Sequence, residues 1–112
     1  MLENIELFAD LSNKELSEIQ QITKKMPLKR GEVIFTQGEF TRDFYIIEAG
    51  QVDILVADQL GEPRVITTLK SGDFFGEMAL FDKNSPRSAT ARSAQNTTLL
   101  QIPGKEFEIL LQ

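Results

Sequence analysis

From residue 32 onward the chain consists of short apolar segments separated by turns that contain glycine, and this pattern constrains the fold strongly. Turn signals that recur about every 8–12 residues are typical of an all-β sandwich or barrel. We therefore expect a small β-sandwich or barrel at the centre of the fold. The expected strands are residues 33–35, 43–47, 51–56, 65–69, 88–93 and 98–102.

Helical patterns flank the expected strands at both ends of the chain. Ser12 and Glu15 form a capping-box pattern that starts a helix, and Pro27 is predicted to end it. Residues 103–111 predict a second helix with Pro103 near its first turn. The apolar face of the first helix is expected to consist of Leu16, Ile19, Ile22 and Met26. A short helical or turn segment before it is expected to pack on the domain through Ile5, Leu7, Phe8 and Leu11.

Composition narrows the range of functions. A chain of 112 residues fits one domain, which we place at 1–112. Because the chain has no cysteine and no histidine, it offers no disulfide, no thiolate nucleophile and no usual zinc, haem or iron–sulfur ligands. The same absence argues against a metal enzyme of the cupin type. A net charge of −5 argues against nucleic-acid binding by this segment. Without a signal-peptide pattern or a long apolar run, we expect no membrane contact and a cytoplasmic location.

Residues 75–90 carry the chemistry of the chain. Gly76 lets the backbone approach a ligand closely, and the next residues predict one turn of helix whose free N–H groups attract anions. Arg87 supplies a planar cation that suits phosphate oxygens, and Glu77 is an acceptor that suits a sugar hydroxyl. This combination suits a small cyclic phosphate diester. The alternative is a lone surface ion pair between Glu77 and Arg87.

The stretch from Phe74 to Thr90 closely resembles the phosphate-binding cassette of the cyclic nucleotide-binding domain family. That cassette has the pattern Phe-Gly-Glu-aliphatic-Ala-Leu, a short variable link, and Pro-Arg-small-Ala-Thr. Every position is filled here, with Met78 as the aliphatic residue and Ser88 as the small one. The order of elements along the chain is similar to the family as well. The resemblance implies a mainly β fold, a jelly-roll β-barrel with flanking N- and C-terminal helices and a one-turn helix in the cassette.

The resemblance also implies roles for individual residues. Arg87 is expected to hold the exocyclic phosphate oxygens, and Glu77 is expected to accept a hydrogen bond from the ribose 2′-hydroxyl. Ser88 is expected to donate to the phosphate or to a base edge. Phe74, Phe75 and Phe81 are expected to be packing residues that anchor the cassette. The remaining expected ligand contacts are Gly76, the backbone N–H groups of Met78 and Ala79, and, as walls for the base, Ile54, Ile66 and Thr67.

The implied function is a cyclic nucleotide sensor rather than an enzyme, since no base lies beside a nucleophile. We expect cyclic AMP as the ligand, with cyclic GMP as the alternative, and no cofactor. The effector is expected to lie outside this chain. By analogy, the full-length protein is expected to be a bacterial transcription regulator of the catabolite-activator type and to form homodimers. A kinase or channel regulatory domain, or a nucleotide-independent barrel for protein contacts, is the alternative. Family members continue into a further helix that closes over the base, whereas this chain stops at Gln112.

Overall fold

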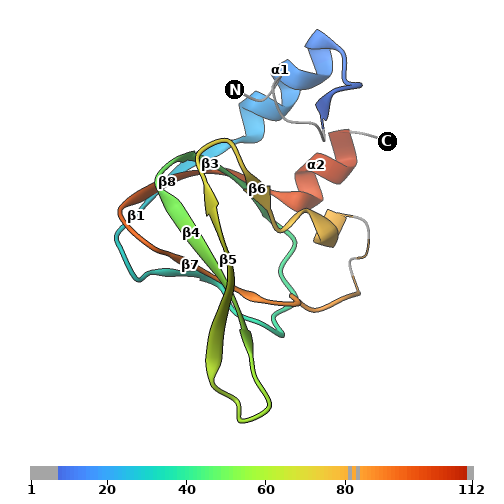
Figure 1. The fold of residues 1–112 in the computed structure, drawn as a ribbon. Helices are drawn as coiled ribbons and strands as arrows, with labels where there is room; N and C mark the ends of the chain where they lie inside the picture. The colour runs from blue at the N-terminus through green and yellow to red at the C-terminus, as the bar shows by residue number, and fades with distance from the viewer. Residues whose placement is uncertain (1–7, 81, 83, 111–112) are drawn as a thin grey trace.

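The computed structural model describes residues 8–80, 82 and 84–110, and its centre is a sandwich of two antiparallel sheets (Figure 1). The first sheet has the strand order β1 (Lys24–Leu28), β8 (Thr97–Ile102), β3 (Phe44–Ala49) and β6 (Phe74–Phe75). The second has the order β2 (Val33–Phe35), β7 (Thr90–Ser93), β4 (Gln51–Ala57) and β5 (Pro63–Lys70). The prediction of a mainly β fold is confirmed.

Strand β3 shows how the first sheet is buried on both faces. Side chains of successive strand residues point to opposite faces of a sheet. Phe44 and Ile46 accordingly join a core cluster beneath the helices, whereas Tyr45 and Ile47 join a second cluster between the two sheets. All four are buried, which explains why this segment reads as a continuous apolar run instead of an alternating one.

Two helices cover one end of the sandwich (Figure 1). Helix α1 (Asn13–Ile22) begins at the predicted capping box, in which Ser12 and Glu15 bind each other's backbone N–H groups. Helix α2 (Gly104–Leu110) follows β8 directly. Phe107 of α2 packs its ring against those of Phe8 and Phe44, with centroids 5.9 and 5.2 Å away, so aromatic contacts join α2 and the segment before α1 to the first sheet.

Two expectations about these elements need correction. The first helix ends at Ile22, and Met26 and Pro27 belong to strand β1 instead. Proline is tolerated there because β1 is an edge strand, where a missing N–H costs no ladder bond on the open side. The sequence pattern also missed β6, a strand of only two residues. Ile5, Leu7 and Phe81, which were expected to pack, and Leu111, which was expected to end the second helix, lie outside the described residues.

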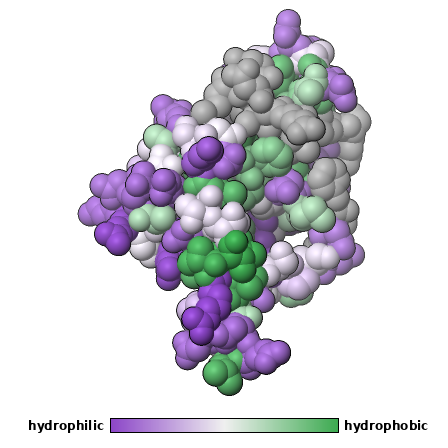
Figure 2. Space-filling view, in the orientation of Figure 1, coloured by the Kyte–Doolittle hydropathy of each residue, from purple (hydrophilic) through white to green (hydrophobic). Residues whose placement is uncertain are grey.

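The hairpin of β4 and β5 projects away from the helices, and Figure 2 shows hydrophobic surface on it. Leu60, Val65 and Ile66 are exposed there. Within the described ranges, no helix has the length and apolarity that a membrane crossing requires.

At the other end of β4, Gly50 joins β3 to β4 with a positive φ of 105°. A Cβ at this position would lie 2.4 Å from Thr97 Oγ1 and 2.7 Å from the Asn96 carbonyl oxygen.

Candidate ligand-binding site

A cavity of about 710 Å³ lies at the side of the sandwich, next to the 3₁₀ turn η3 (Glu77–Leu80). One wall comes from the end of β2 and the loop after it, a second from β6 and η3, and a third from the segment that precedes β7. Ile54 of β4 completes the lining. The lining residues are Phe35, Gln37, Gly38, Ile54, Phe74, Phe75, Gly76, Glu77, Met78, Ala79, Ser85, Pro86, Arg87, Ser88 and Ala89.

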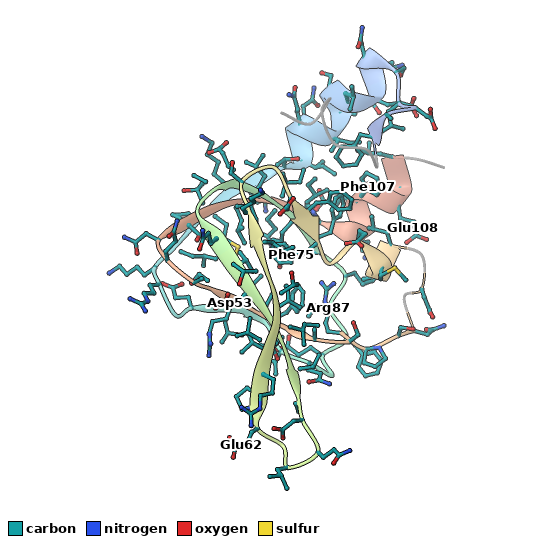
Figure 3. The ribbon with its side chains drawn as sticks, viewed as in Figure 1. Asp53, Glu62, Phe75, Arg87, Phe107 and Glu108 are labelled. Carbon is teal, nitrogen blue, oxygen red and sulfur yellow. The ribbon has the colours of Figure 1, made fainter. Side chains whose placement is uncertain are left out.

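Arg87 is the central charged group of this cavity, and only 7% of its surface is exposed (Figure 3). Its Nε donates to Thr41 Oγ1 at 2.9 Å, and one terminal nitrogen donates to the carbonyl oxygen of Gly76 at 2.9 Å. The other terminal nitrogen donates to the carbonyl oxygen of Asp43. A guanidinium has five N–H donors, so these three bonds fix its position and leave two donors for an anion.

Arg87 stays charged although its burial opposes the charge. Its guanidinium carbon lies 4.1 Å above the centre of the Phe35 ring, a cation–π arrangement. Burial lowers the pKa of Arg87, while Tyr45 and the carboxylates of Asp43, Glu39 and Glu77 act in the opposite direction. Arginine nevertheless stays protonated at neutral pH because its ordinary pKa is so high. The cavity therefore holds a fixed positive charge against an apolar wall, where an anion is attracted more strongly than in water.

Gly76 brings the backbone close to this charge. Its φ of 84° lies in the left-handed region that glycine tolerates. A Cβ there would stand 3.1 Å from an Arg87 terminal nitrogen and 3.3 Å from the Asp43 carbonyl oxygen. Glycine is thus required at this position for two reasons: it adopts the conformation of the turn into η3, and it leaves room for the guanidinium.

The turn η3 places the three residues that follow Gly76 in different environments. Glu77 is half-buried, Met78 is exposed and Ala79 is buried, and all three line the cavity. The first N–H groups of a short helix have no partner within it, so they are available to an anion. Within the described part of the chain, Arg87 forms no ion pair with Glu77. The alternative of a lone surface ion pair is therefore wrong, because Arg87 is buried and bonded elsewhere.

The structure brings most, but not all, of the predicted site residues together. Ser88 is exposed and lines the cavity, and Ile54 both lines it and packs against the core between the sheets. Ile66 and Thr67 are not among the lining residues. Thr67 lies opposite Ile54 on β5, one strand further from the cavity, and Ile66 is the extra residue of a β-bulge and is 59% exposed. Of the predicted base wall, only Ile54 lines the cavity, and a contact of the base with Ile66 or Thr67 stays a prediction.

Sequence reasoning missed the residues that hold Arg87 and the wall formed after β2. Phe35, Gln37 and Gly38 line the cavity, and Thr41 and Asp43 bind the guanidinium. The glycine turn at Gly38 was the one sequence signal for this wall of the cavity. In the structure, the backbone N–H of Gly38 bonds to the Arg87 carbonyl oxygen at 2.8 Å. Phe74 and Phe75, expected only to pack, both pack and line the cavity. Nowhere in the described ranges do three acidic side chains gather closely enough to hold a metal ion.

The model of the cyclic nucleotide-binding domain matches residues 25–112, which include every residue of this cavity. The chain belongs to the cyclic nucleotide-binding domain family. The regulatory subunit of a cAMP-dependent protein kinase from Blastocladiella emersonii is 33% identical over 110 residues, which cover 98% of this chain and 27% of that protein. The cAMP-activated global transcriptional regulator of Salmonella typhimurium is 34% identical over 88 residues, which cover 79% of this chain and 41% of the regulator.

Solved structures agree with this assignment. The regulatory domain of Toxoplasma gondii protein kinase A, determined with cAMP, superposes with a TM-score of 0.91 at 27% identity and covers 97% of this chain and 41% of that one. The cyclic nucleotide-binding domain described here spans about two fifths or less of the length of these relatives. The chain is a cyclic nucleotide-binding regulatory module, and its matched family is a binding domain rather than a catalytic one.

Proposed function

We propose that this domain binds cyclic AMP in the 710 Å³ cavity, with the cyclic phosphate on Arg87. The observation that carries the proposal is the buried guanidinium, which three protein acceptors hold in place while two of its donors stay available. A planar fork held in advance loses little entropy when it meets two phosphate oxygens. The kinase regulatory domain that superposes on this chain was solved with cAMP, which supports the choice of ligand.

The remaining contacts follow from the lining of the cavity. The N–H groups of Met78 and Ala79 at the start of η3 add donors to the phosphate, and Gly76 permits the close approach. Glu77 accepts from the ribose 2′-hydroxyl, and Ser88 donates to the phosphate or to a base edge. Ile54 and Phe35 offer apolar surface for the base. The hydroxyl of Ser88 is able to meet the guanine amino group, but cyclic AMP receptors resemble the chain at this position too, so Ser88 does not decide between cyclic AMP and cyclic GMP.

Calorimetric titration with cyclic AMP and cyclic GMP tests the proposal directly. We expect saturable binding of one equivalent of cyclic AMP per chain and weaker binding of cyclic GMP. Linear AMP, which lacks the cyclic diester, is the matched control and should bind more weakly than either. A clear preference for cyclic GMP would overturn the choice of base, and no binding of either cyclic nucleotide would refute the function.

Glu77 should make the domain discriminate between ribose and deoxyribose. A hydrogen bond to a charged group contributes about 1.5–3 kcal/mol, which corresponds to about 10- to 150-fold in dissociation constant. The unmodified protein should bind cyclic AMP more tightly than its 2′-deoxy analogue by this factor, and Glu77→Ala should largely erase the preference. Glu39→Ala is a suitable control, because Glu39 is an exposed carboxylate near Arg87 that does not line the cavity. Equal discrimination by all three proteins would exclude this role.

We also propose that ligand binding is transmitted to an effector outside this chain. A bacterial transcription regulator is our first choice, supported by the 34% identity to the Salmonella typhimurium regulator. The comparable identity to a kinase regulatory subunit supports the alternative of a kinase-linked module. A DNA-binding segment elsewhere in the protein is expected in the first case only. In either case a further helix that covers the base should tighten binding by favouring the closed state.

A further inference from the structure

Met78 differs from the other methionines of this chain because its side chain is exposed on the lining of the cavity. It is 68% exposed and lies on η3, next to Glu77. Met26, by contrast, is half-buried in β1 and packs against the core between the sheets. The third methionine, Met1, lies outside the described residues. The sulfur of Met78 is therefore more accessible to small molecules in solution than that of Met26.

The composition of the chain makes methionine the target of a peroxide. Thiols react with peroxides as thioethers do, but this chain has no cysteine. With hydrogen peroxide, a lone pair of the thioether sulfur attacks one peroxide oxygen, and an S–O bond forms as the O–O bond breaks. The proton of the transferred hydroxyl passes to the departing hydroxide, which leaves as water. The sulfur loses the two electrons that the peroxide gains, and the product is a sulfoxide.

A sulfoxide at Met78 changes the cavity in two ways that both oppose the binding of an anion. It replaces an apolar, flexible side chain with a polar one, so the lining loses apolar surface. Its oxygen is also a hydrogen-bond acceptor with a partial negative charge, on the turn whose N–H groups are proposed to bind the phosphate. An oxygen that reached the two remaining donors of Arg87 would occupy the groups that the phosphate needs.

The backbone at this position is held on both sides of the side chain. Ala79, the next residue, is buried, and the N–H of Asp82 donates to the Met78 carbonyl oxygen at 3.1 Å. The sulfoxide therefore stays on the cavity-lining turn, and only rotation of the side chain is able to move its oxygen. This freedom makes the expected effect on binding moderate instead of complete.

We propose that Met78 is an oxidation site at which a peroxide lowers the affinity of the cavity for cyclic AMP. The inference rests on the proposed function of the cavity and adds an oxidant as a second input to it. The expected loss of affinity is about fourfold to fifteenfold, which is the loss that one or two methylene groups of apolar contact would give. A ligand in the cavity should in turn slow the oxidation of Met78, because it covers this side chain.

The test treats the full chain with hydrogen peroxide and stops the reaction with catalase. Mass mapping of peptides gives the extent of oxidation at each methionine, and calorimetry with cyclic AMP gives the dissociation constant before and after treatment. Met78 should be oxidised sooner than Met26, and more slowly when cyclic AMP is present. The treated protein should bind about fourfold to fifteenfold more weakly. The two methionine sulfoxide reductases, one for each sulfoxide epimer, should restore the affinity together.

Two variants assign the effect to one methionine. Each is compared with its own untreated sample, and circular dichroism confirms that treatment leaves the fold intact. Met78→Leu keeps an apolar side chain that a peroxide does not oxidise, so treatment should leave its affinity unchanged. Met26→Leu is the matched control, and treatment should weaken its binding as much as that of the unmodified protein.

The results separate the inference from the proposed function. Untreated protein that bound no cyclic AMP would refute the proposed function and the inference with it. Untreated protein that binds, and keeps its affinity after complete oxidation of Met78, would overturn the inference alone. The same conclusion follows if treatment weakens Met78→Leu as much as the unmodified protein, or if cyclic AMP leaves the rate of oxidation at Met78 unchanged.

Discussion

Arg87→Ala should weaken the binding of cyclic AMP about 30-fold to several-thousand-fold. Removing one partner of a buried charge pair costs about 2–5 kcal/mol, and Arg87 is the buried cation of the cavity. Part of the loss is expected to come from Thr41 and the Asp43 and Gly76 carbonyl groups, which lose their donor. Isothermal calorimetry measures the dissociation constant, and circular dichroism confirms that the variant is folded.

Two further variants sharpen this experiment. Arg87→Lys keeps the charge but loses the fork, so it should bind with an affinity between those of the unmodified protein and the alanine variant. Arg64→Ala removes one positive charge from the exposed β4–β5 hairpin, where Arg64 pairs with Asp58, and should leave the affinity unchanged. An Arg87→Ala protein that bound cyclic AMP as tightly as Arg64→Ala would refute the role of Arg87.

Gly50→Ala should lower the free energy of unfolding by about 2–6 kcal/mol. The positive φ of 105° costs a residue with a side chain about 1–3 kcal/mol, and forcing a methyl group into filled space costs a similar amount again. The obstacle is largely backbone, since the added Cβ would lie 2.7 Å from both the Asn96 carbonyl oxygen and Thr97 Cα. Urea unfolding followed by circular dichroism gives the difference in free energy.

Gly61→Ala is the matched control for this substitution. Gly61 also has a positive φ, 81°, but a Cβ there would meet no atom within 4 Å. It should therefore lose only the contribution of backbone strain and remain clearly more stable than Gly50→Ala. Equal losses in the two variants would show that conformation alone, and not the contact with β8, requires glycine at position 50.

Features encoded by neighbouring residues could be predicted from the sequence. The capping box at Ser12 and Glu15 begins α1 as expected, because its two hydrogen bonds join residues three apart. The 3₁₀ turn after Gly76 was predicted for a similar reason, since its glycine and short apolar run are contiguous. Strand β1 was not recognised, because Lys24 and Lys25 face solvent on an edge strand and Pro27 suggests a helix end.

The features that the sequence did not reveal depend on which strand or side chain a residue meets in the fold. The bulge that turns Ile66 outward arises from the register of β5 against β4, which the β5 sequence alone does not reveal. Arg87 could be predicted as the cation of the site, but Thr41 and Asp43 could not be predicted as its acceptors. They precede it by 46 and 44 residues, and one of the two acceptor groups is a backbone carbonyl that any residue would supply.

The same separation along the chain determines when the domain is completed during synthesis. Two of the three acceptors of Arg87, those at Thr41 and Asp43, emerge from the ribosome 46 and 44 residues before it. At translation speeds of about 5–20 residues per second they wait about 2–9 s for their donor. The wait for β8 is longer still, and that strand lies between β1 and β3 in the first sheet. A nascent chain paused before residue 97 therefore lacks the strand that joins β1 to β3, and the first sheet is completed only after β8 has been synthesised.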